Sequence, residues 1–213
     1  MATSIVQIHD FIRFIERKER GVFHTIEEVD LFLDRCQMEV YEELISIYAQ
    51  TQKIHDALSV FKSSFNFTSS STGLIDLPSD YLHLRSAYTV IASTMYPIRF
   101  PEDDEYVEAV KSQLRPVSTT RPLGVHEENT IQLNPATLQY GVINYFRRPD
   151  APVYAYTLNG REIVYDSVNS VQLEWNDTTY LNKIMLRVLA YFGINLSEPD
   201  ITAFGVQYNQ NVS

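Results

Sequence analysis

The hydrophobic period of this chain changes near Gly73, and that change constrains the fold more than any other feature of the sequence. Before it, apolar residues recur every three or four positions, beginning at Val29 after a capping box formed by Thr25 and Glu28. This spacing predicts a helix over residues 26–61, about 54 Å long at 1.5 Å per residue. Because a small core does not need such a length, we expect the helix to break near Gln50–Gln52 or to project.

After Gly73 the apolar residues come in short runs separated by turn residues, which is typical of strands. Asn159-Gly160 lies between two extended runs and favours a tight hairpin turn. A cluster of acids opens one short helix, where negative charge suits the helix N-terminus. The predicted strands cover residues 74–77, 87–91, 96–100, 123–126, 130–133 and 141–147, and the short helix covers 104–113.

Helical spacing returns at the end of the chain. Thr178 or Thr179 is expected to cap a helix over Tyr180–Phe192 that Gly193 closes, and a terminal helix should follow to about Gln210. The order of helices, strands and helices predicts an α+β fold. Its helical bundle would comprise residues 1–65 and 174–213, with a central antiparallel β lobe over residues 66–173.

One turn joins the helical part to the β lobe. Pro78 presets the backbone for a turn, and Asp80 is expected to cap the short run that follows it. Tyr81 and Leu82 should then anchor this run to the core. We therefore predict that Pro78 and Asp80 matter for folding and assembly and not for chemistry.

The charge and cysteine content exclude several classes of protein. A net charge of −10 argues against a general nucleic-acid binder, which needs clustered basic residues. The single cysteine, Cys36, excludes an internal disulfide framework and fits a reducing compartment; its place on an apolar helix face predicts a buried thiol. No apolar run approaches the roughly 18 residues of a membrane span, so no membrane partner is expected.

No motif for catalysis or cofactor binding stands out. Seven glycines form no phosphate-binding loop, the five histidines are scattered singly, and no nucleophile elbow is present. The acids over residues 102–105 resemble a cation site but lack the alternating spacing and central glycine of a calcium loop. We therefore expect neither an enzyme nor a bound metal or cofactor.

Several short motifs occur in a fixed order along most of the chain. They are Thr25-x-x-Glu28 before a long helix, Ile54-x-x-Ala57-Leu58-x-x-Phe61, Leu77-Pro78-Ser79-Asp80-Tyr81-Leu82, Ile131-x-Leu133-x-Pro135 with Val142-x-x-Tyr145-x-x-Arg148-Pro149, and Leu173-x-Trp175 before the closing helix. This succession resembles the head–tail connector, or portal adaptor, proteins of short-tailed bacteriophages. The closest likeness is to the ring proteins of crAss-like phages.

The resemblance implies a structural virion protein, made in the host cytoplasm, that forms a homo-oligomeric ring of commonly about twelve copies. Such a ring lies in the neck below the portal protein, extends the DNA channel, and docks neighbouring tail or neck ring proteins. DNA would pass during ejection without specific binding, which suits an acidic chain because like charges repel it. The candidate channel or interface residues are Glu27, Glu28, Asp34, Glu39, Glu43, Glu102, Asp103, Asp104, Arg147 and Arg148.

An alternative function is a ligand- or glycan-binding β module of a phage tail accessory protein. It rests on aromatic residues that could stack on sugars, although such rings more often fill a core. The aromatic candidates are Tyr140, Tyr154, Tyr156 and Trp175.

Overall fold

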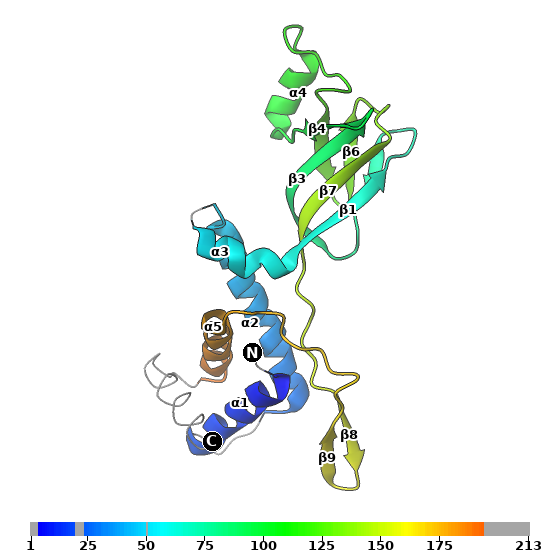
Figure 1. Ribbon diagram of the computed structural model, residues 1–213. Helices are drawn as coiled ribbons and strands as arrows, with labels where there is room; N and C mark the ends of the chain where they lie inside the picture. Colours follow the sequence, from blue (N-terminus) through cyan, green and yellow to red (C-terminus); the bar gives the residue numbers. More distant parts are fainter. Residues whose placement is uncertain (1–3, 20–23, 50, 194–213) are drawn as a thin grey trace. The chain divides into compact units, whose positions relative to one another are not determined.

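The computed structural model describes residues 4–19, 24–49 and 51–193, and it confirms an α+β fold with a helical part and antiparallel sheets (Figure 1). The chain divides into two compact units. One comprises residues 1–60 and 149–213, and the other comprises residues 61–148. The sequence placed the second boundary at residue 173. The difference arises because residues 149–155 bond to the helices: the Asp150 carbonyl accepts from Gln37, and the Tyr154 N–H donates to Asp30.

The helical unit is built around α2. Its capping box is confirmed, since the Glu28 N–H donates to Thr25 and the Thr25 N–H donates to Glu28. The long predicted helix breaks as expected, because α2 ends at Ser46 and a turn precedes α3. The helices of this unit are α1 (Ile5–Glu19), α2 (Ile26–Ser46), α3 (Gln52–Ala57) and α5 (Thr178–Tyr191), and a 3-10 turn spans Leu58–Phe61.

Helix α5 packs its apolar face against α2, and its ends differ in part from expectation. The predicted cap at Thr178 or Thr179 is wrong: Asp177 is the N-cap, and its carboxylate accepts from the Thr179 N–H at 2.8 Å. Aspartate is one of the strongest capping residues, which explains the difference. Gly193 has the positive φ of +75° expected after a helix. The predicted terminal helix to Gln210 lies outside the described residues.

The β unit contains two antiparallel sheets. The larger has the order β1-β7-β3-β4 (Figure 1), and the smaller has the order β2-β6-β5. Its core is lined by the buried residues Ile75, Ile131, Leu133 and Ile143. Helix α4 (Asp103–Lys111) connects β4 to the segment before β5. The strands are β1 (Lys62–Thr68), β2 (Leu74–Asp76), β3 (Tyr81–Ile91), β4 (Thr94–Ile98), β5 (Leu123–Glu127), β6 (Thr130–Asn134) and β7 (Tyr140–Arg147).

Strand β7 lies between β1 and β3 in the larger sheet and pairs with both of them. Strand β3 begins at Tyr81, six residues before the predicted start, because β7 pairs along its length with two register shifts. At Gly141 the backbone of β7 lies close to Tyr88 and to the ring of Phe67. A Cβ there would lie 2.3 Å from the Tyr88 carbonyl oxygen and 2.4 Å from the Phe67 ring. Glycine is therefore required at this position.

Candidate assembly surface

The acids on the exposed side of α2 make contacts within the helical unit. The Glu43 carboxylate accepts from Lys183 Nζ at 2.7 Å and from Arg187 Nη2 at 2.5 Å, and Glu39 lies 3.7 Å from Arg187 Nη1. The hydrogen bond from Lys183 is the main cause that lowers the pKa of Glu43. Because Lys183 is 39% exposed, Glu43 44% and Arg187 29%, each pair is worth only about 0.5 kcal/mol. These acids add weak ion pairs between α2 and α5, whose packing rests on the apolar face of α5.

The other three candidate acids of α2 are also engaged. Glu28 completes the capping box. Glu27 accepts from the Tyr156 hydroxyl at 2.8 Å, and Asp34 accepts from Gln37 Nε2 at 3.0 Å. The pKa of Glu27 is lowered, first by a backbone hydrogen bond and then by the bond from Tyr156. A role of these acids at a channel or subunit interface stays a prediction.

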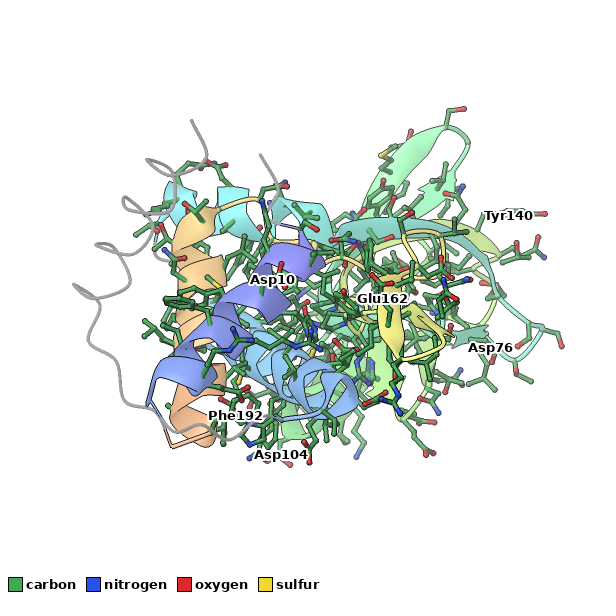
Figure 2. All side chains as sticks on the ribbon, turned by 90° about the horizontal axis from the view of Figure 1, so that it is seen from below. Asp10, Asp76, Asp104, Tyr140, Glu162 and Phe192 are labelled. Atoms are coloured by element: carbon green, nitrogen blue, oxygen red, sulfur yellow. The ribbon has the colours of Figure 1, made fainter. Side chains whose placement is uncertain are left out.

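Two acids at the start of α4, Glu102 and Asp104, are exposed. Glu102 is the N-cap residue but makes no side-chain capping bond, and Asp104 is exposed (Figure 2). The side chain of Asp103 lies outside the described part of the chain. Across the described residues, no group of three or more His, Cys, Asp or Glu side chains could hold a metal ion.

The Pro78–Leu82 turn is fixed by contacts that differ from those predicted. Asp80 caps no helix, because the chain continues directly into strand β3. Its carboxylate instead accepts from the Tyr145 hydroxyl at 3.0 and 3.2 Å. The Tyr81 N–H donates to the Pro78 carbonyl at 3.0 Å and closes the turn, and the Leu82 side chain is half-buried on β3.

An aromatic cluster covers this turn. The Tyr81 ring stacks on His126 and tilts against Tyr145, with 5.5 Å between ring centroids in each case. Burial raises the pKa of Tyr81 to about 12, so its hydroxyl stays protonated. The cluster joins β3, β5 and β7, which come from both sheets of the β unit.

The two adjacent arginines end the β unit. The Arg147 guanidinium lies 5.8 Å from the centre of the Phe61 ring, which is within cation–π range. Arg148 is exposed, and its backbone N–H donates to the Asp80 carbonyl at 2.8 Å. This bond ties the exit of the chain from the β unit to the Pro78–Leu82 turn.

The four aromatic residues proposed as a sugar platform do not act alike. Trp175 is 1% exposed, and Tyr154 packs between His9 and Tyr165. Tyr156 donates its hydroxyl to Glu27. Tyr140 alone of the four is widely open, at 60% exposed, and it projects from the end of its strand (Figure 2). One open ring gives little support to the glycan-binding alternative.

Two polar pairs, each with one fully buried member, were not predicted from the sequence. His9 is 1% exposed and its Nε2 lies 2.8 Å from Asp30 Oδ1, so the pair joins α1 to α2. Glu16 is equally buried and bonds to His24 Nδ1. A signal existed for His9, which follows Ile8 and precedes Ile12 by three positions on the apolar face of α1. Its partner is 21 residues away, and no local pattern indicates it.

The β8–β9 hairpin presents an apolar face. It comprises β8 (Tyr156–Asn159) and β9 (Glu162–Tyr165), with Gly160 at φ +66° in the predicted turn. Residues opposite one another share a face, so Leu158 and Ile163 project on the same side as Tyr156 and Tyr165. Leu158 is 69% exposed and Ile163 is 46% exposed. No third strand pairs with this ribbon in the described chain (Figure 1).

No protein-family model matches the chain, and no curated protein matches it significantly. Among the helices that the structure describes, none is both long and apolar enough to cross a membrane.

Proposed function

We propose that the protein is a structural subunit of the head–tail connector of a short-tailed bacteriophage. Several copies form a ring below the portal protein, extend the DNA channel and dock the tail. The proposal starts from the resemblance carried by the order of motifs. It is supported by the α+β fold, in which the chain divides into a helical unit and a β unit.

The observation that carries the proposal is the apolar face of the β8–β9 hairpin. A two-stranded hairpin is marginally stable by itself in water. The base of this one is held by the bond from Tyr156 to Glu27 and by the bond from Gln172 to the Tyr165 hydroxyl. Its tip leaves Leu158 and Ile163 open. Full burial of such a side chain stabilises by about 1.5–3 kcal/mol, so contact with a neighbouring subunit would be favourable.

The charge of the chain is compatible with a DNA channel. Binding to DNA gains free energy when basic side chains release counterions from the phosphates. A subunit with a net charge of −10 lacks a net positive charge to drive this binding. DNA could therefore slide past a ring of such subunits without adhering to it.

Localisation in the virion is the direct test. We expect a labelled copy of the protein to appear at the neck in electron micrographs of virions, and the purified protein to form rings alone or on purified portal. Absence of label from the neck would refute the connector function. A protein that stays monomeric both alone and with portal would refute ring formation.

The hairpin gives a sharper test with a matched control. Leu158→Asp should weaken ring formation at least tenfold, which corresponds to about 1.4 kcal/mol, because it places a charge in the proposed contact. Thr157→Asp adds the same charge on the opposite face of the ribbon and should leave assembly unchanged. If both variants assemble like the parent, the hairpin is not the contact, even where neck localisation stands.

A further inference from the structure

A cavity of about 570 Å³ lies in the β unit beside α4 and the start of β5. Three arginines line it, Arg99, Arg115 and Arg121, and all three are exposed. Apolar side chains, including those of Val117 and Leu123, form another part of its wall. The cavity therefore combines a strongly positive part with an apolar part.

Backbone contacts fix the positions from which the arginines project. The Arg99 N–H donates to the Pro122 carbonyl at 3.1 Å, and its own carbonyl accepts from Gly124 at 2.9 Å. Arg121 exchanges backbone bonds with Ser118 in a tight turn, at 2.9 and 3.4 Å. The Arg115 N–H donates to Ser112 Oγ at 3.3 Å, just beyond the end of α4. The residue after β4 and the loop between α4 and β5 thus bring three arginines to one cavity.

The three guanidinium groups have no acidic partner within the described part of the chain. Two arginines of the helical unit do have one: Arg35 pairs with Glu39, and Arg187 pairs with Glu43. Like charges around one cavity repel each other, and a bound anion removes that repulsion. The C-terminus of α4 adds about half a negative charge near Ser112, which three full positive charges exceed.

We propose that this cavity binds an oxyanion, a phosphate or a carboxylate, carried on an apolar or aromatic ligand. Arginine forks bind either group through two parallel hydrogen bonds. The hydroxyls of Ser112 and Thr120, which also line the cavity, are further donors. Val117 and Leu123 would contact the apolar part of the ligand. This site is independent of the connector function, because nothing in its geometry requires a ring.

The test is a titration of the full-length protein at low salt with phenyl phosphate, benzoate and inorganic phosphate, followed by NMR signals of the arginine side chains and by calorimetry. We expect phenyl phosphate or benzoate to bind with a Kd of about 1 mM or below, and inorganic phosphate to bind at least tenfold more weakly. Tighter binding of phenyl phosphate would assign a phosphate ligand, and tighter binding of benzoate a carboxylate.

Arginine variants distinguish binding in the cavity from nonspecific attraction of an anion to positive charge. The double variant R115Q/R121Q should lose at least tenfold in affinity while its thermal unfolding stays unchanged, because both side chains are exposed. Arg161→Gln removes an exposed arginine from the β8–β9 hairpin and should have no effect. The proposal is overturned if no probe saturates, or if R161Q weakens binding as much as the double variant. If inorganic phosphate binds as tightly as phenyl phosphate or benzoate, the proposal that the ligand carries an apolar or aromatic part is overturned.

Discussion

Replacing Asp80 by alanine should destabilise the β unit by about 1–2 kcal/mol. The Asp80 carboxylate accepts from the hydroxyl of Tyr145 at 3.0 and 3.2 Å, and Tyr145 is 3% exposed. A hydrogen bond to a charged group contributes about 1.5–3 kcal/mol. We expect a value near or somewhat below the lower end of this range because Asp80 itself is half-buried and keeps contact with water.

Amide hydrogen exchange measures this effect locally. The amides of β7, which contains Tyr145, should exchange about 5–30 times faster in D80A. Tyr145→Phe and the double variant complete a thermodynamic cycle, in which we expect a coupling free energy of about 1 kcal/mol. Asp76→Ala is the control, since Asp76 is an exposed aspartate on β2 and its loss should change stability by less than about 0.5 kcal/mol.

Two results would refute this reasoning. Unchanged exchange of β7 in D80A would mean that the turn is held by its backbone bonds and by the ring of Tyr81. Strictly additive effects of D80A and Y145F would mean that the two side chains act separately, whatever the distance between them.

Three further predictions follow from single positions. Cys36 is fully buried and burial raises its thiol pKa to about 12, so it should resist thiol reagents in the native protein and react on unfolding; fast native labelling would contradict this. Gly141→Ala should lower the free energy of unfolding by at least about 2 kcal/mol in a denaturant titration, because the new Cβ would lie 2.3 Å from the Tyr88 carbonyl oxygen. Gly160→Ala meets open space but has a φ of +66°, so it should lower the free energy of unfolding by only about 1 kcal/mol. Equal losses would be inconsistent with the contact at Gly141. The pKa of Glu43 in the folded protein is below its ordinary 4.5, so its stabilising bonds to α5 should be present above pH 4.5 and lost as the pH falls through the folded pKa. Glu43→Gln should remove this contribution to the acid dependence of stability. An acid unfolding transition that is the same in both proteins would contradict the prediction.

The elements that the sequence predicted well are those set by neighbouring residues. The capping box at Thr25 and Glu28 and the Asn159-Gly160 turn each depend on a few consecutive side chains. These are local preferences of the backbone, and they hold before any tertiary contact forms. The break expected near Gln50–Gln52 is predicted from helix length alone, and α2 ends earlier, at Ser46.

The features that the sequence did not predict depend on distant partners. The early start of β3 at Tyr81 requires the pairing that β7 offers. The contact between Asp80 and Tyr145 spans 65 residues, and it takes the place of the expected cap on the short run that follows Asp80. The cavity lined by Arg99, Arg115 and Arg121 combines the end of β4 with the loop between α4 and β5, and in the sequence its arginines look like ordinary solvated residues.

The pairing of β1 with β7 has a practical consequence for engineering. The first residue of β1, Lys62, lies directly opposite Phe146 near the end of β7. Adjacent strands are about 5 Å apart, so the chain leaves the β unit beside the point where it entered. A linker of a few glycines could join residue 60 to residue 149, so that residues 61–148 could be removed as a unit. Grafting a foreign domain at this junction would give a chimera that retains the native helical unit.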